Sequence, residues 1–188
     1  SESGWHNLPG ERKENEKNSG LERLKNFLFL AAEELRKEDV PVDNFCRINM
    51  DRYLDVYPDE MINFDVQTIR EFHQKWNPGL SESKIQEKQL EKSGEKLEML
   101  KTAIFQKNLR DRFIVVRSSS YDDIKNGVDN ILLDRENGNV ICAFDEVGDV
   151  NDKVYQQKVN EVTEKDAHEA GVNLKYGIYM EEPLDEPG

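Results

Sequence analysis

Carboxylates occur inside the most apolar part of this strongly charged chain of 188 residues. Asp129 lies in the apolar run VDNILL, and Asp145 and Glu146 directly follow the apolar run VICAF. An ionised carboxylate in a strand-like apolar segment is costly in free energy unless a cation, a metal ion or several hydrogen bonds accompany it. These three acids are therefore the first candidates for a functional site.

Both acidic segments belong to a predicted β-hairpin. Two segments rich in Val, Ile, Leu and Phe flank the turn residues Glu136-Asn137-Gly138, namely 128–134 and 139–147. A three-residue turn places Asp129 opposite Asp145, whereas a two-residue turn at Asn137-Gly138 places Asp129 opposite Glu146. Either register brings two carboxylates together, and like charges at close range raise each other's pKa or need a cation between them. Because Mg²⁺ and Mn²⁺ prefer carboxylate oxygens, we expect one of these ions at the site.

The elements that position these acids follow from the periodicity of apolar residues. Helical spacing predicts helices over 21–37, 65–76, 81–112 (with a break near Ser93-Gly94) and 151–171. Short runs of β-branched and aromatic residues predict strands over 112–118, 128–134, 139–147 and 173–180. Asp65 is expected to cap the second helix, and Ser83 with Gln86 is typical of a capping box. The segment 41–63 has no dominant period, and Asp122 and Asp123 are expected in a loop with Asx turns.

This order of elements predicts an α/β (α+β) protein. We expect an α-β-β-β-α-β core around a mixed central sheet of about four strands, preceded by an N-terminal helical lobe. The predicted regions are a flexible arm (1–19), the helical lobe (20–93), the α/β core (94–182) and a loose acidic tail (183–188).

The amino-acid composition limits the classes of partner that are expected for this chain. The chain has 26 Lys and Arg against 39 Asp and Glu, a net charge of −13, which argues against non-specific binding of polyanions by the whole surface. No apolar run approaches the ~20 residues that span a bilayer, so no membrane partner is expected. Cys46 and Cys142 are expected to be reduced, as is typical of a cytoplasmic protein. The helical lobe is a candidate surface for a protein partner or a homodimer.

The segments YDDIKNGVD and CAFDEV, within residues 95–181, resemble the PD-(D/E)XK nuclease-like superfamily. The resemblance implies a restriction-endonuclease-like core in which Asp129 is the first metal-binding acid and Asp145 the second. It implies that Glu98, on the helix before the sheet, completes the metal site, while Glu146 stays the alternative to Asp145. The implied cofactor is Mg²⁺ or Mn²⁺, and the implied partner is nucleic acid.

The resemblance departs from the family pattern at one position. The family places a lysine two residues after the second acid, and this chain has Val147 there. Lys153 is expected to act as the catalytic lysine instead, since it lies nearest in sequence to Asp145, with Lys158 and Lys125 as alternatives. The leading hypothesis is a metal-dependent phosphodiesterase of nuclease type, in which metal-bound water attacks a phosphate. The alternative is a catalytically degenerate protein of the same fold that acts as a binding or interaction module.

Overall fold

The computed structural model describes residues 9–144 and 174–177 of the chain. These residues form a mixed α/β structure with the following elements: α1 (Pro9–Lys37), η1 (Met50–Tyr53, a 3-10 helix), α2 (Asp59–Trp76), α3 (Glu82–Glu91), α4 (Ser93–Leu109), β1 (Phe113–Arg117), α5 (Ser120–Asn126), β2 (Asn130–Asp134) and β3 (Val140–Phe144). The α/β class predicted from the sequence is confirmed. The helix predicted over 151–171 lies outside the described residues.

The three strands form one antiparallel sheet in the order β1-β2-β3. The predicted hairpin is confirmed, and Gly138 in its turn adopts the left-handed conformation (φ 70°) that the turn requires. A register shift between Leu132 and Leu133 separates the turn from the rest of the ladder. Beyond that shift the pairing continues to Asn130, which lies opposite Phe144. This register is the one expected from the predicted three-residue turn.

The prediction of a mixed sheet with a final strand over 173–180 is wrong for the described residues. Lys175 and Tyr176 form a bend, and the three described strands are all antiparallel. The backbone N–H groups of Lys175 and Tyr176 donate to the carboxylate of Asp122 instead of to a strand. Parallel pairing is limited, in the described parts of the chain, to a single bridge between Arg47 and Arg117.

Several helix boundaries differ from the predicted ones. α1 begins at Pro9, within the predicted arm, because proline is well tolerated in the first helical turn and Glu, Lys and Arg favour helix. α2 begins at Asp59, after Pro58, with Asp59 and Glu60 in its first turn, so Asp65 is not its cap. Asp65 is instead 1% exposed in the helix interior.

The predicted break in the third helical segment is confirmed. Lys92 has an extended conformation (ψ 142°), which separates α3 from α4. The capping box is wrong, since the N-cap of α3 is Ser81 and its side chain makes no capping hydrogen bond. The loop predicted around Asp122 is also wrong, because Ser119 caps a short helix there and accepts a hydrogen bond from the Asp122 N–H.

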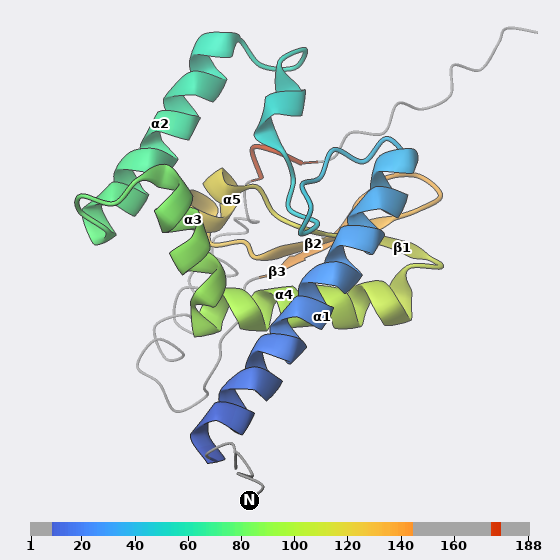
Figure 1. Ribbon diagram of the computed structural model, residues 1–188. Helices are drawn as coiled ribbons and strands as arrows, with labels where there is room; N and C mark the ends of the chain where they lie inside the picture. The colour runs from blue at the N-terminus through green and yellow to red at the C-terminus, as the bar shows by residue number, and fades with distance from the viewer. Residues whose placement is uncertain (1–8, 145–173, 178–188) are drawn as a thin grey trace, which may run out of the picture.

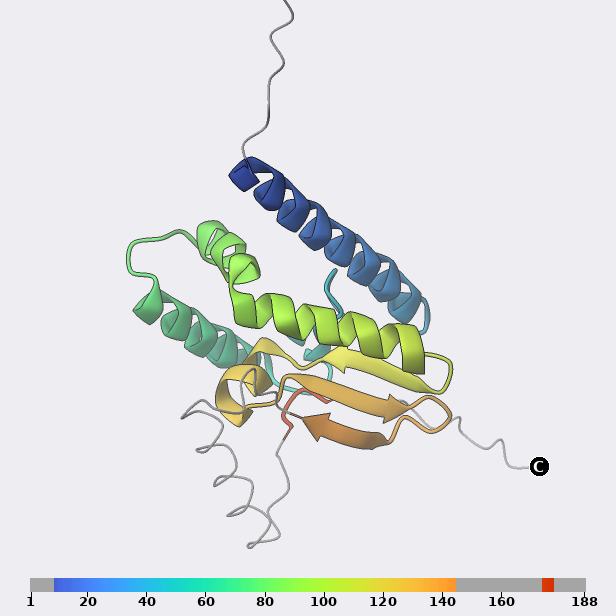
Figure 2. The same cartoon turned by 90° about the horizontal axis from the view of Figure 1, so that it is seen from below.

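The helices pack around the sheet in a simple arrangement. α4 packs on β1, and α1 packs on α4 (Figure 1). In Figure 2, α1, α4 and the sheet lie in successive layers, and α2, α3 and α5 lie near one end of the strands. β1 is buried on both faces, since Ile114, Val115 and Val116 are all fully buried. None of the described helices is long and apolar enough to cross a membrane.

Candidate functional site

The residues predicted to form a metal site are only partly within the described structure. Asp129 is 9% exposed, directly before β2, and its carbonyl oxygen accepts a hydrogen bond of 2.9 Å from the Ser118 N–H. Lys125 is exposed on α5. The remaining predicted site residues lie outside the described residues: Asp145, Glu146, Lys153 and Lys158.

Glu98, the predicted helix ligand, binds arginines in this structure. Its Oε2 atom lies 2.8 Å from Nη2 of Arg117 and 3.6 Å from Nη2 of Arg47. Glu95, one turn earlier on α4, lies 2.6 Å from the same Nη2 of Arg117. Across residues 9–144 and 174–177, no group of three His, Cys, Asp or Glu side chains is placed to hold a metal ion.

Arg117 is the centre of this network and is the last residue of β1. Its side chain is 1% exposed, while those of Glu95 and Glu98 are 18% and 20% exposed. An arginine buried in this way needs carboxylates around it, because desolvating an unpaired charge is costly. Its Nε atom, however, has no hydrogen-bond partner among the described residues.

A turn before η1 brings a second arginine next to Arg117. The carboxylate of Asp43 accepts hydrogen bonds from the N–H groups of Phe45 and Arg47, and Cys46 takes a left-handed conformation (φ 60°). The backbone of this turn pairs with β1, since the Arg117 N–H donates to the Cys46 carbonyl at 2.8 Å. Arg47 then donates to Asp123 on α5 at 3.0 Å.

Two arginines and three carboxylates thus share one largely buried site: Arg47, Arg117, Glu95, Glu98 and Asp123. Burial raises the pKa of Glu98, and the charges of Asp123 and Glu95 add to that effect. Burial acts in the same direction on Glu95, but the charges of Arg117 and Arg47 bring its pKa below the ordinary value. Glu98 therefore keeps its proton to a higher pH than Glu95 does.

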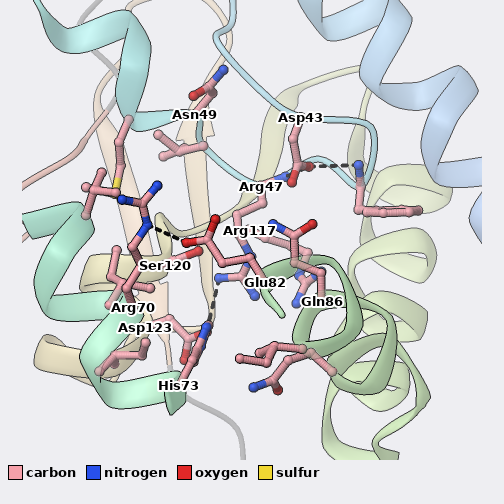
Figure 3. Close-up of a pocket in the computed structure, with 18 of the residues that line it drawn as sticks. Asp43, Arg47, Asn49, Arg70, His73, Glu82, Gln86, Arg117, Ser120 and Asp123 are labelled. Carbon is pink, nitrogen blue, oxygen red and sulfur yellow. Dashed lines mark hydrogen bonds and ion pairs between the residues drawn. The ribbon is translucent and has the colours of Figure 1, made fainter. Parts of the chain in front are cut away.

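A pocket of 610 Å³ opens beside this network (Figure 3). Residues from the 43–51 turn, α2, α3, α4, α5 and the end of β1 line it. Its apolar wall includes Ile48, Val66, Ile69, Ile85 and Leu90. Its charged wall carries five acids and three arginines: Asp43, Asp51, Glu82, Glu95, Asp123, Arg47, Arg70 and Arg117.

An ion pair and a histidine also line the pocket. Arg70 on α2 and Glu82 on α3 form the ion pair (Figure 3). His73 lines the pocket, and burial, followed by the positive charge of Lys92, lowers its pKa. The lowered pKa favours the neutral imidazole, which donates a hydrogen bond from one ring nitrogen and accepts one at the other.

The geometry of this site is better suited to binding than to acid–base catalysis. A glutamate with a raised pKa next to one with a lowered pKa is a pattern seen in catalytic pairs. Here, however, both carboxylates accept hydrogen bonds from one guanidinium, at 2.6 and 2.8 Å. Charge-assisted hydrogen bonds of this length hold the side chains in place and occupy one oxygen of each carboxylate.

The arginines were not predicted as site residues, although the sequence contains a signal for them. Arg117 ends the apolar run FIVVR, so the same reasoning that singled out Asp129 applies to it. The pocket histidine was not predicted either, because His73 has no partner at ligand spacing in the sequence.

The fold and the site define a mixed α/β protein with a small antiparallel sheet and an arginine–carboxylate pocket between its helices. Comparison of the chain with protein-family models, with curated proteins and with solved structures gave no match.

Proposed function

We propose that this chain is a binding module whose pocket holds a ligand with an oxygen acceptor and a cationic group. The observation that carries the proposal is Arg117, which lines the pocket, is 1% exposed and has an Nε–H group without an acceptor among the described residues. Buried N–H groups in folded proteins nearly always have an acceptor. A ligand with a carbonyl or carboxylate oxygen supplies one.

The charge of the pocket wall defines the rest of the ligand. Five acids against three arginines leave an excess of negative charge, and the whole chain carries a net charge of −13. This wall repels a negatively charged ligand group and attracts a cationic one. The apolar side chains of Ile69, Ile85 and Leu90 suit the aliphatic stem of a long cationic side chain. The ligand class is therefore one with an oxygen acceptor, an aliphatic stem and a cationic head.

L-Argininamide contains all three features and is a direct probe. We expect it to bind with at least about 10-fold higher affinity, ~1.4 kcal/mol, than either acetamide or methylguanidine, which contain one feature each. Calorimetry gives the affinities, and amide NMR signals of pocket residues such as Ser120 report where the probe binds.

Matched variants test the location of the probe. Asp123→Asn removes one carboxylate of the pocket wall, whereas Asp55→Asn removes the same charge from an exposed position after η1. We expect only the first change to weaken binding of L-argininamide. If millimolar probe gives no heat and moves no pocket signal in the wild type, the proposal is wrong.

A metal-dependent nuclease of PD-(D/E)XK type is the second candidate function. One observation favours it: the pair of Asn130 with Phe144 belongs to the register in which the sequence puts Asp129 opposite Asp145. Asp129 is also nearly buried, as expected of a carboxylate in a structured site. Asp145, Glu146 and Lys153 carry the rest of this hypothesis and lie outside the described residues.

A cleavage assay decides on the nuclease hypothesis. If it is right, the protein cuts plasmid or single-stranded DNA in the presence of Mn²⁺, and Asp129→Ala abolishes the activity while Asp55→Ala retains it. A metal-bound water and the carboxylates that hold the metal act together, so loss of either removes most of the rate. Cleavage that survives Asp129→Ala, or no cleavage by the wild type, would rule out Asp129 as a catalytic ligand.

A further inference from the structure

The exposed side of α2 carries large apolar side chains. They recur at three- or four-residue spacing, so they lie along one side of the helix. Their exposed fractions are 40% for Met61, 72% for Phe64, 43% for Phe72 and 66% for Trp76. Single exposed apolar residues are normal on a protein surface, but a row that includes three aromatic rings is typical of an interaction site. The row formed by Met61, Phe64, Thr68, Phe72 and Trp76 is called the α2 stripe below.

The α2 stripe is separate from the arginine–carboxylate pocket. α2 lines the pocket with another side of the helix, through residues such as Val66, Ile69 and His73, and none of the five stripe residues contributes to the pocket wall. Both views show α2 at the margin of the described structure, on the side away from α1 (Figures 1 and 2). The inference below therefore does not rest on the proposed function.

The polar residue in the middle of the stripe has its hydrogen bond within the helix. Thr68 is partly buried, and its hydroxyl donates to the Phe64 carbonyl at 2.9 Å, one turn earlier. Covering a hydroxyl that lacks a partner is costly, whereas covering this one leaves its hydrogen bond intact. Another protein surface can therefore cover the whole stripe without leaving the Thr68 donor unpaired.

The order of residues along the stripe favours a second copy of this chain as the partner. Counted outward from Thr68, a phenylalanine lies four residues away in each direction, and a further apolar side chain ends the stripe on each side. Two copies of α2 that cross antiparallel at Thr68 bring Phe64 of each copy next to Phe72 of the other. A two-fold interface requires this self-complementarity, because every contact in it occurs twice.

The charges beside the stripe have the same symmetry. Glu60 in the first turn of α2 and Lys75 in the last turn border the stripe on the same side. An antiparallel crossing at Thr68 places Glu60 of each copy near Lys75 of the other, whereas a parallel crossing opposes like charges. Glu71 is on the same border, where it accepts a hydrogen bond of 3.1 Å from Gln67. In the antiparallel arrangement its neighbour in the other copy is the neutral Gln67.

We propose that two copies of this chain associate through their α2 stripes, antiparallel about a two-fold axis at Thr68. Phe64, Phe72 and Trp76 form the centre of the interface, where aromatic side chains contribute most to binding. The pairs of Glu60 with Lys75 fix the direction of the crossing. Because the 18 residues of α2 extend about 27 Å, the interface is at the small end of specific ones, and we expect a micromolar dissociation constant.

The first test is sedimentation velocity of the full chain from low to high micromolar concentration. Physiological ionic strength is used because the net charge of −13 repels a second copy when salt is low. We expect the wild type to dimerise, and Phe64→Asp to weaken the association at least about 10-fold by placing a charge in the apolar centre. Leu30→Asp is the matched control, since Leu30 is 54% exposed on α1, and it should leave the association unchanged.

Three outcomes of this test would overturn the proposal: a wild type that stays monomeric, a Phe64→Asp variant that associates as well as the wild type, and an equal loss in Leu30→Asp. Both substituted residues are exposed, so we expect both variants to keep their helical signal in circular dichroism. If Phe64→Asp loses that signal, the charge variants of the second test decide.

The second test reverses the charges beside the stripe. Glu60→Lys and Lys75→Glu each turn two symmetric attractions into repulsions and should weaken the dimer at least about 5-fold. For Glu60→Lys this loss is opposite to the effect of its smaller net negative charge, so it reports the local contact. The double variant has the wild-type net charge and exchanged pairs, and it should regain the wild-type affinity. Single variants as tight as the wild type, or a double variant as weak as the single ones, would overturn the antiparallel pairing.

Discussion

Arg117→Met is expected to lower the free energy of unfolding by about 3–5 kcal/mol at neutral pH. Methionine retains much of the volume of the arginine stem, so the cavity left behind is small. The loss arises because Glu95 and Glu98, with side chains 18% and 20% exposed, keep their charges and lose their closest cation. Arg47 remains, but at 3.8 and 3.6 Å its ion pairs with them are longer.

The effect of Arg117→Met should depend on pH in a way that a packing defect does not. In the wild type the pKa of Glu95 is lowered, so its ionised form stabilises the fold above the ordinary value of 4.5, and that contribution is lost as the pH falls. Without Arg117, burial raises the pKa of Glu95 as well as that of Glu98. The stability of the variant then decreases as the pH rises through these raised values, so the difference from the wild type is smaller at about pH 5 than at about pH 7.

Arg112→Met is the matched control, because it makes the same chemical change just before β1 at an exposed residue. Its guanidinium lies 5.1 Å from the ring centre of Phe113, a contact worth at most about 1 kcal/mol at an exposed site. Urea unfolding of the three proteins at both pH values gives the comparison. An equal loss for Arg117→Met at the two pH values would show that the glutamates do not cause it.

Local patterns predicted much of the fold. The composition and length of the apolar runs identified β1, β2 and β3, and the Gly138 turn identified the hairpin of β2 and β3. The helical character of α1, α2, α3 and α4 was also recognised, including the break between α3 and α4 at Lys92. These features depend on residues a few positions apart, which is the range over which periodicity and turn chemistry act.

The site could not be predicted to the same extent because its residues meet only through tertiary packing. Glu98 was expected beside a metal ion, yet its charge partners are Arg117, 19 residues later, and the more distant Arg47. The contact between Arg47 and Asp123 spans 76 residues. No spacing rule links such positions, and only the burial of a charge in an apolar run, as at Arg117, gives a local signal.

The sequence around Asp122 contains a helix-capping signal, but we interpreted it as a loop. Ser119 and Asp122 have the three-residue spacing of a capping box, and the Ser119 hydroxyl donates to the Asp122 carboxylate at 2.8 Å. The serine-rich sequence with two adjacent acids was interpreted as a loop. The further role of Asp122 depends on Lys175 and Tyr176, more than 50 residues later, and was therefore invisible in the local sequence.

Asp122→Ala is expected to lower the free energy of unfolding by about 3 kcal/mol or more, because several buried donors lose their acceptor together and each costs about 1–3 kcal/mol. Asp122 is fully buried and accepts hydrogen bonds from four groups: the Ser119 hydroxyl, the Asn126 amide and the N–H groups of Lys175 and Tyr176. Hydrogen exchange should show faster exchange at the last two N–H groups, which lose their only described acceptor.

Asp123→Ala is the matched control for this change, since it removes the same charge from the neighbouring position of α5. The Asp123 side chain is 29% exposed and pairs with Arg47, which also lies near Glu95 and Glu98. Because Arg47 keeps Glu95 and Glu98 as partners and Asp123 is itself partly exposed, Asp123→Ala should be less destabilising than Asp122→Ala. Urea unfolding measures both variants. If their losses are equal, loss of negative charge from α5 explains the effect, and the hydrogen bonds that the Lys175 and Tyr176 N–H groups donate to Asp122 do not hold residues 174–177 in place.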